Sequence, residues 1–242
     1  MTGARRDAWR RLERELIRCR RCPRLAAWRE ETALRKVPRF RTEEYWGKPV
    51  PGFGDPEARL LVVGLAPAAH GANRTGRMFT GDRSGQWLWR ALHKAGFADN
   101  PASLHREDGL RALDCFVSAA LRCAPPANKP LHAELAACRK WLLAEYSLLG
   151  NLRAVVGLGR VGFEAACDAA RASGLADWST RPHFGHGLCH RWERITIFSS
   201  YHPSQQNTFT GRLTEPMLDG VFAAVRREIG RRRRRISAGA VS

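Results

Sequence analysis

The chain has 242 residues, and 44% of them are hydrophobic, which is enough for one domain with a sizeable core. Its 41 lysines and arginines exceed its 23 acidic residues by a formal charge of +18. That excess favours a polyanionic partner, either nucleic acid or an anionic membrane surface, although a basic surface that is merely solvated fits it about equally well. No apolar run is long enough to span a bilayer and no segment resembles a membrane anchor, so we expect no membrane partner. Without a secretory signal, the expected location is cytoplasmic and nucleoid-associated.

Apolar runs and helical periodicity alternate along the chain. A helix is predicted at 4–22, where Trp9, Leu12 and Leu16 share one side. Further along, continuous apolar runs predict buried strands, and amphipathic periodicity predicts the helices that follow them. The strands are expected at 60–64, 115–121, 154–158 and 195–199, and the later helices at 84–96, 131–149, 161–171 and 215–229. This alternation implies an α/β fold with a mostly parallel sheet and helices on both faces.

No linker or internal repeat interrupts the pattern, so residues 1–230 are expected to form a single domain. Residues 231–242 begin with an arginine run and are predicted to be a disordered basic tail. Such a tail is either a non-specific phosphate-binding arm or, more simply, a solvated end. Because open parallel sheets bind ligands at the carboxyl ends of their strands, segments 64–82 and 201–214 and the chain after Leu121 are expected to converge on one cleft.

Four of the seven cysteines are candidate metal ligands. Cys19 and Cys22 form a C-x-x-C pair, whereas Cys123 and Cys138 are widely spaced. Four such cysteines hold either zinc or an iron–sulfur cluster, and the spacing alone does not decide between them. A redox-active pair is disfavoured because no strand precedes Cys19. The other three are expected to be core residues: Cys115, Cys167 and Cys189.

Three long segments carry a specific resemblance. Residues 64–82, GLAPAAHGANRTGRMFTGD, and 202–214, HPSQQNTFTGRLT, resemble the two active-site motifs of the family 5, or type B, uracil-DNA glycosylases. Residues 122–130, RCAPPANKP, resemble the cluster-binding segment that lies between those motifs. Together with the first cysteine pair, the resemblance extends from about Cys19 to the last helix.

The resemblance implies a three-layer α/β/α sandwich around a four-stranded, mostly parallel sheet. It also implies a [4Fe–4S] cluster held by Cys19, Cys22, Cys123 and Cys138. The implied activity is hydrolysis of the N-glycosidic bond of uracil, and of other deaminated or modified bases such as hypoxanthine and ethenocytosine, to leave an abasic site. The expected partner is damaged double-stranded DNA, with single-stranded DNA left open, and the expected state is a monomer.

A glycosylase extrudes its target base into a pocket and stabilises the departing anion. By position in the motifs, Phe79 is predicted to stack on the base, and His202 to donate a hydrogen bond to its O2. The start of the first motif lacks an acidic residue, which suggests a dissociative route. Asn73 is the candidate that orients water or the sugar, with Asp82 and His70 behind it; turn formation is its alternative role.

The pocket is expected to include Ala68 and Ser118. Related families present an asparagine on the strand before Cys123, and the corresponding position here is Ala119. A short hydroxyl or a backbone group would have to replace that amide. This departure puts strict selectivity for uracil in doubt.

Several residues are predicted to contact DNA. Ser204 and Gln205 would bind phosphates at a strand end, and Arg77 and Lys129 are further phosphate contacts. Arg212 and Leu213 are placed to enter the gap left by the flipped base, with Leu213 as the wedge. Simple packing before the last helix is an equally good interpretation of Leu213.

Two other functions compete. A damage sensor that has lost catalysis would keep the fold, and the missing polar residues permit it. An electron-transfer iron–sulfur protein would not need His202 or Phe79. A covalent base-trapping relative is disfavoured, because no inserted basic loop follows the first motif.

Overall fold

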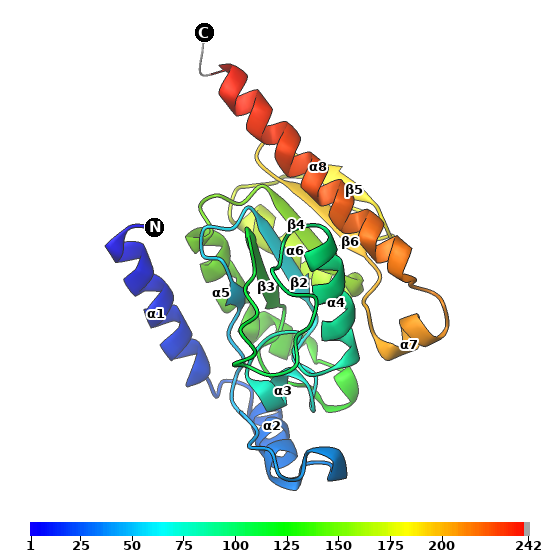
Figure 1. Cartoon of the computed structure of the whole chain (residues 1–242). Coiled ribbons are helices and arrows are strands. Elements are labelled where there is room, and N and C mark those ends of the chain that lie inside the picture. Colours follow the sequence, from blue (N-terminus) through cyan, green and yellow to red (C-terminus); the bar gives the residue numbers. More distant parts are fainter. Residues whose placement is uncertain (240–242) are drawn as a thin grey trace.

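Six strands form one sheet in the order β1-β3-β2-β4-β6-β5 in the computed structural model, which describes residues 1–239 and the side chains of residues 1–231 (Figure 1). Their bounds are β1 Phe53–Gly54, β2 Leu60–Gly64, β3 Cys115–Ala119, β4 Ala154–Leu158, β5 Cys189–Arg191 and β6 Thr196–Ser200. The four central strands are parallel, and β1 and β5 add antiparallel edges. The predicted α/β class and the four parallel strands are confirmed, but the sheet has six strands rather than four.

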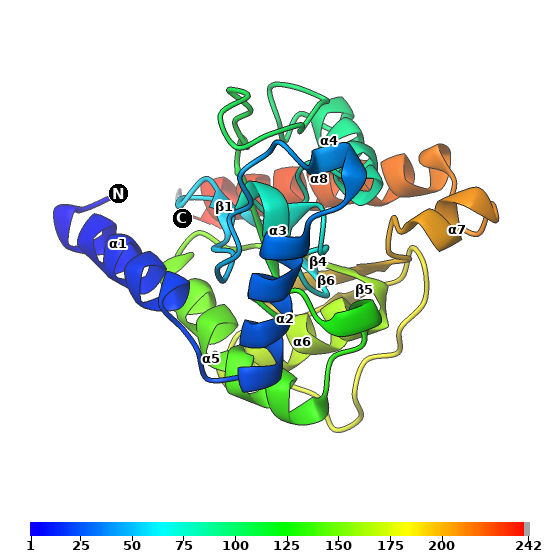
Figure 2. The same cartoon turned by 90° about the horizontal axis from the view of Figure 1, so that it is seen from below.

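Helices cover both faces of the sheet, as the alternation predicted. In the view from below, α4 and α8 lie on one side of the strands and α5 and α6 on the other (Figure 2). The longer helices are α1 Gly3–Ile17, α2 Pro23–Arg35, α4 Arg83–Lys94, α5 His132–Leu148, α6 Gly159–Ala172 and α8 Glu215–Gly239. Short helical turns complete the chain: η1 Pro38–Phe40, α3 Ala72–Thr75, η2 Pro126–Asn128 and α7 Gln205–Phe209.

Alternate residues of each central strand feed two separate cores. Val62 of β2 packs with Trp89 of α4 and Phe222 of α8. Its neighbour Leu61 faces the other way, toward Phe163 of α6. A parallel strand that is covered on both faces needs apolar residues at every position, which is why these strands read as continuous apolar runs.

The helix predicted over 4–22 ends earlier than predicted, and a separate helix begins just beyond that range. α1 ends at Ile17 and α2 begins at Pro23, and the residues between them include Cys19 and Cys22. Proline at the first helical position has the φ that a helix needs, and its missing N–H would be unpaired there in any case. The break therefore holds the first cysteine pair on a turn instead of inside a helix.

The C-terminal end also differs from the expectation. α8 continues through the arginine run to Gly239, where the sequence predicted a disordered tail from residue 231. The last three residues of that predicted tail, 240–242, lie outside the described part of the chain. Among the described residues, no helix is both long enough and apolar enough to cross a membrane.

Candidate active site

Two aromatic rings meet beyond the carboxyl ends of β2 and β6. Phe79 lies in the loop after β2, and His202 follows β6. Their ring centroids are 5.8 Å apart, with 30° between the planes. The Phe79 ring rests on Gly64, where an added Cβ would lie 2.6 Å from Phe79 Cζ. The two segments predicted to converge, 64–82 and 201–214, therefore do so.

Phe79 is held in a backbone conformation that side chains rarely adopt. Its φ is 51°, in the left-handed region. The Trp89 indole Nε1–H donates to the Phe79 carbonyl oxygen at 2.9 Å, and a Cβ added at Gly85 would lie 2.1 Å from that oxygen. The first turns of α4 thus fix the loop. Strain of this kind persists where surrounding contacts over-determine the geometry, and it clusters at functional sites.

His202 is a neutral imidazole at neutral pH. Burial lowers its pKa from 6.5 to about 4, because the protein gives the charged form no compensating partner. Its carbonyl oxygen accepts a hydrogen bond from Asn207 Nδ2 at 2.9 Å, and the Ser204 hydroxyl caps α7 by accepting from the Asn207 N–H. The second motif therefore folds on itself and leaves the imidazole free to act as a hydrogen-bond donor toward a ligand.

Asn73 is fully buried behind the first-motif loop. Its Nδ2 donates to the carbonyl oxygens of Arg29 at 3.2 Å and Ala69 at 3.4 Å. Its backbone N–H donates to the carbonyl oxygen of Ala68. These bonds tie the loop to α2 and favour the turn-forming role of Asn73 over its predicted role in orienting water. Ala68 is half-buried and shapes the same turn.

Asp82 is the only carboxyl group in the first motif. Its Oδ1 accepts from the Gly85 N–H at 2.8 Å and caps α4. Its Oδ2 lies against Gly71, where an added Cβ would be 2.0 Å away. Burial raises the pKa of this carboxyl. Sequence reasoning placed Asp82 behind Asn73, although an Asp that begins a helical run is a recognisable N-cap signal.

Ser118 does not face the ring pair. Its hydroxyl donates to Glu145 Oε2 at 2.6 Å on the α5 side of the sheet. Ala119 packs in the same core cluster as Phe79. Because successive strand residues point to opposite faces, one of the two had to turn away. The expectation that the Ser118 hydroxyl reads the base is therefore corrected.

Arg77 is unavailable to phosphate in this structure. Its side chain is 4% exposed and forms an ion pair with Asp108 at 2.6 Å. It also donates to Thr80 and Ser103. The predicted phosphate contact is wrong because a first-motif arginine turned inward to hold the loop of Asp108.

Leu213, the predicted wedge, is completely buried, and its N–H donates to Asn207. The exposed apolar residue of the second motif is Phe209, at 68% exposure. The Arg83 guanidinium stacks on the Phe209 ring at 4.3 Å. Arg83 Nε also donates to Thr208 Oγ1 at 2.9 Å, so α7 is clamped to the start of α4. Packing is therefore the correct interpretation of Leu213.

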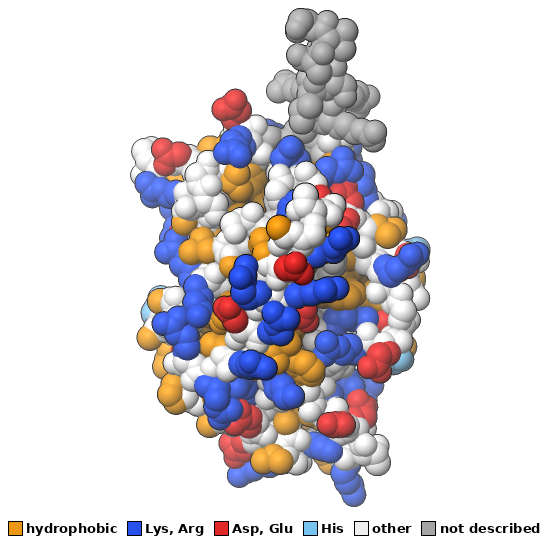
Figure 3. All heavy atoms as spheres, turned by 90° about the vertical axis from the view of Figure 1, so that its left-hand side faces the viewer, with side chains coloured by type: hydrophobic (Ala, Val, Ile, Leu, Met, Phe, Trp, Pro, Cys, Tyr) orange, Lys and Arg blue, Asp and Glu red, His pale blue; other side chains and the backbone are white. Residues whose placement is uncertain are grey.

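The other predicted DNA contacts remain accessible. Gln205, Arg212 and Lys129 are exposed. The Arg212 guanidinium lies 4.7 Å from the centroid of the Tyr201 ring, which holds it beside the strand end that carries His202. Positive charge also covers other faces: lysine and arginine side chains dominate the side that α1 occupies (Figure 3). A field of this kind attracts any DNA segment, independently of sequence.

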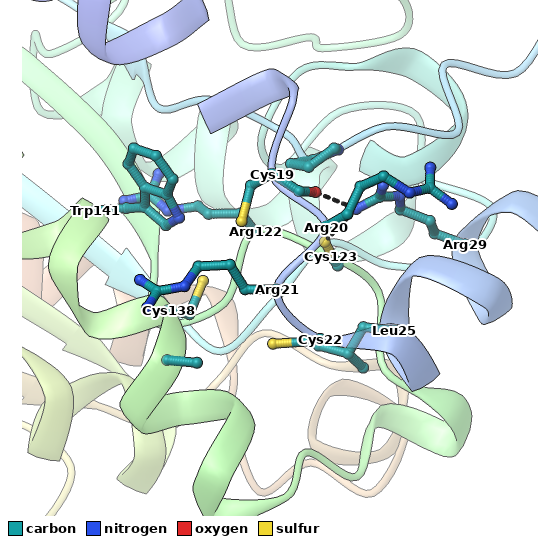
Figure 4. Close-up of a pocket in the computed structure, with 12 residues that line it drawn as sticks. Cys19, Arg20, Arg21, Cys22, Leu25, Arg29, Arg122, Cys123, Cys138 and Trp141 are labelled. Atoms are coloured by element: carbon teal, nitrogen blue, oxygen red, sulfur yellow. Dashed lines mark hydrogen bonds between the residues drawn. The ribbon is translucent and has the colours of Figure 1, made fainter. Parts of the chain in front are cut away.

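The four predicted cysteine ligands converge. Their side chains line one hollow between the α1–α2 connection, the segment after β3 and the start of α5, and the sulfur atoms surround a common space (Figure 4). Within residues 1–231, no three Cys, His, Asp or Glu side chains are placed to hold a single metal ion.

Buried positive charge accompanies the sulfur atoms. Arg29 and Arg122 line the same hollow, and Arg29 Nη1 donates to Cys123 Sγ at 2.9 Å. Nε of both arginines and Nη1 of Arg122 are buried, with no hydrogen-bond partner in the described part of the chain. Unsatisfied buried cations next to four cysteines fit an anionic group that the cysteines would hold.

Known proteins are similar to this chain over most of its length. The Uracil DNA glycosylase superfamily model matches residues 51–226. The chain is 49% identical over 219 residues to the type-5 uracil-DNA glycosylase of Thermus thermophilus, which covers 89% of this chain and 95% of that protein. It is 50% identical over 214 residues to the type-5 enzyme of Mycobacterium tuberculosis, covering 88% and 78% respectively.

A more distant relative separates two types within the superfamily. The type-4 uracil-DNA glycosylase of Pyrobaculum aerophilum is 27% identical over 186 residues, whereas the type-5 protein of the same organism is 41% identical over 215 residues. The higher identity to the type-5 protein agrees with the type-5 resemblance of the motifs that contain Phe79, His202 and the cysteines. The chain therefore belongs to the uracil-DNA glycosylase superfamily, and within it to the type-5 uracil-DNA glycosylases.

Proposed function

We propose that this protein removes uracil from DNA by hydrolysing the N-glycosidic bond, and leaves an abasic site as a monofunctional glycosylase. The observation that carries the proposal is the pairing of Phe79 with a neutral, half-buried His202 at the carboxyl ends of two parallel strands. The type-5 relatives are named for the same activity.

The ring pair suits the chemistry of a departing base. An extruded base stacks on the Phe79 ring, and the His202 N–H donates to the base O2 as negative charge develops there. A neutral imidazole that is already oriented by its surroundings needs no proton rearrangement to do this. The sugar takes on oxocarbenium character as the bond breaks.

We expect the base-binding site to be permissive. Ala119, the last residue of β3, lies in the same core cluster as Phe79 and has no amide to read the edge of a pyrimidine, and Ser118 is turned away toward Glu145. Selection then rests on shape and on the ease of extruding a damaged base. We therefore include hypoxanthine and ethenocytosine among the substrates.

Phe209 replaces Leu213 as the proposed wedge. A base that leaves the duplex leaves a gap, and an exposed apolar side chain that enters the gap keeps the strand distorted. Phe209 is exposed, lies seven residues after His202, and is oriented by the Arg83 guanidinium. Gln205, Arg212 and Lys129 would contact the flanking phosphates.

The cysteine hollow is proposed to hold a [4Fe–4S] cluster. When bound, the cluster cross-links the α1–α2 connection to the segment after β3 and to α5, and so acts as a structural brace. The four thiolates that would hold it belong to Cys19, Cys22, Cys123 and Cys138.

Base release from labelled duplexes that contain uracil, hypoxanthine or ethenocytosine, followed by alkaline cleavage at abasic sites, tests the activity. We expect the wild type to release uracil and His202→Ala to be slower by about 10²–10³-fold, the usual effect of removing one donor to a developing anion. Duplex affinity is expected to persist in the variant. Equal rates in the two proteins would remove His202 from this role, and no release by the wild type would refute the proposed activity.

A further inference from the structure

The cysteine hollow contains two buried arginines, and each of them also belongs to a second network. Arg29 lies on α2, and Arg122 follows β3. The exposed fractions of their side chains are only 3% and 1%. Arg29 Nη1 donates to Cys123 Sγ at 2.9 Å and to the Cys19 carbonyl oxygen at 3.3 Å. Burial raises the pKa of the Cys138 thiol, and the charge of Arg122 and a hydrogen bond from its backbone oppose that rise.

The charges of these arginines are only partly compensated by the protein. Arg29 pairs at 3.3 Å with Glu30, whose side chain is 39% exposed and also pairs with Arg20. Arg122 pairs at 2.5 Å with the buried Glu145 and leaves its Nε and Nη1 without partners among the described residues. A buried guanidinium with unused donors is costly unless an anion faces it. Four thiolates on a metal cluster supply that anion.

The Arg29 network reaches the first-motif loop. The carbonyl oxygen of Arg29 accepts from Asn73 Nδ2 at 3.2 Å. The Asn73 N–H in turn donates to the carbonyl oxygen of Ala68 at 3.0 Å. Thus one residue contacts Cys19 and Cys123 with its side chain and holds the loop of Phe79 with its backbone.

The Arg122 network reaches the opposite wall. Glu145 Oε2 accepts from Arg122 Nη2 and also from the Ser118 hydroxyl at 2.6 Å. Ser118 precedes Ala119, which pairs with Gly64 across the β2–β3 ladder. The Phe79 ring rests on Gly64. The second arginine is therefore connected to the strand ends that support the base-stacking ring.

We infer that Arg29 and Arg122 are positioning residues that neutralise the thiolate cluster and fix the two walls of the base pocket to it. Arg29 acts through Asn73, and Arg122 acts through Glu145 and Ser118. This inference rests on the proposed cluster. According to this inference, the same two side chains neutralise the charge of the cluster and order the segments around Phe79, so the hollow and the base site are coupled.

The reduction potential of the cluster tests the charge part of the inference. Arg29→Gln and Arg122→Gln each remove a buried cation, which disfavours the more negative, reduced cluster, so both potentials are expected to fall. Arg29→Lys and Arg122→Lys keep the charge and are expected to restore most of the shift. Arg21→Gln is the matched control, because Arg21 lines the same hollow but is exposed, and solvent screens its charge.

The outcomes of this comparison are distinct. Wild-type protein without iron or visible charge-transfer absorption refutes the cluster itself. A loaded wild type whose Arg29→Gln and Arg122→Gln potentials match Arg21→Gln refutes the arginine role and leaves the cluster standing. If a Gln variant loses its cluster, retention in the Lys variant supports the inference, and loss in both Lys variants overturns it.

Hydrogen exchange tests the connection to the pocket. Removing iron from the wild type with an oxidant and a chelator is expected to speed amide exchange in residues 68–76 and 117–122, with residues 162–171 of α6 as the unaffected reference. Unchanged exchange in both pocket segments would overturn the connection. With loaded proteins, kcat for uracil release is expected to fall about tenfold in each Gln variant with KM little changed, and to recover in the Lys variants.

Discussion

His202 shows how its surroundings determine the chemistry of one residue. Burial moves its pKa from 6.5 to about 4, so the folded protein keeps the imidazole neutral while the unfolded chain binds a proton between those pH values. Stability from this residue is therefore complete above about pH 6.5 and is lost as the pH falls toward 4. Keeping the His202 imidazole neutral therefore lowers the free energy of unfolding in acid.

His202→Gln removes that titration and is expected to be less acid-sensitive than the wild type. Between about pH 7.5 and about pH 4.5, the wild type should lose about 2–3 kcal/mol more unfolding free energy than the variant. Urea unfolding of both proteins at the two pH values measures this difference, and all other titrating groups cancel in the comparison. Parallel losses would mean that His202 titrates normally in the folded protein.

Substituting Phe209 is expected to affect activity, whereas substituting Leu213 is expected to affect stability, because Phe209 is exposed and Leu213 is buried. Phe209→Ala is expected to change unfolding free energy by less than about 0.5 kcal/mol but to slow uracil release from duplex far more than from single strands. Leu213→Ala is expected to cost about 2–5 kcal/mol of stability. Thermal unfolding and release from the two substrates decide the matter, and a normal duplex rate in Phe209→Ala would remove it as the wedge.

At the scale of the elements, the central strands could be predicted well and the edges could not. β2 and β4 have the predicted limits, because an apolar run bounded by turn residues has few other solutions in a parallel sheet. β1 and β5 have only two and three residues and no periodicity to recognise. Pro23 was a readable signal for the start of α2, but the helical spacing before it concealed the break.

The motifs predicted which residues meet at the site. They did not predict the direction of side chains that depends on contacts with distant residues. Phe79 meets His202 and the four cysteines line one hollow, so the motifs predicted which residues come together, while their roles stay predictions. The inward turn of Arg77 depends on Asp108, which is 31 residues away, and the sequence gives no signal for that pair. The direction of the Ser118 side chain depends on which face of β3 packs on α5.

Gly64 controls the position of β2 relative to the base-stacking ring. A methyl group there would lie 2.6 Å from Phe79 Cζ, so Gly64→Ala is expected to displace the ring and slow uracil release by about tenfold or more, with the fold retained. Gly220→Ala on α8 is the control, because an added Cβ there meets nothing within 4 Å. Rates and melting temperatures of both variants give the test; an unaffected rate in Gly64→Ala would mean that the ring position is not critical.

At the scale of the whole molecule, the basic C-terminal end lies away from the site. α8 begins beside α7 and runs to the opposite end of the molecule from α2 and α3 (Figure 1). The α8 backbone that carries the arginine run is therefore remote from the ring pair, and we expect the run not to contact a short duplex bound there. This geometry favours the solvated tail over the phosphate-binding arm.

Ending the chain at residue 230 tests that geometry. On a duplex of about one and a half turns, we expect the shortened protein to release uracil at the full-length rate, and the slope of log Kd against log salt to be unchanged. A slope reduced by about one for each lost contact would show that the arginine run binds phosphate.

The corner where α1 meets α2 has a consequence for biosynthesis. Leu16 and Leu25 pack on Leu121, Cys138 and Trp141, so the first 25 residues have their packing surface only after α5 has been made. At a synthesis rate of about 5–20 residues per second, that surface follows roughly ten seconds later. The N-terminal helices must wait on the ribosome with their apolar sides open, and a chain interrupted before Trp141 has no means of closing this corner. Quality control that recognises exposed apolar helices would thus remove incomplete copies before they reach DNA.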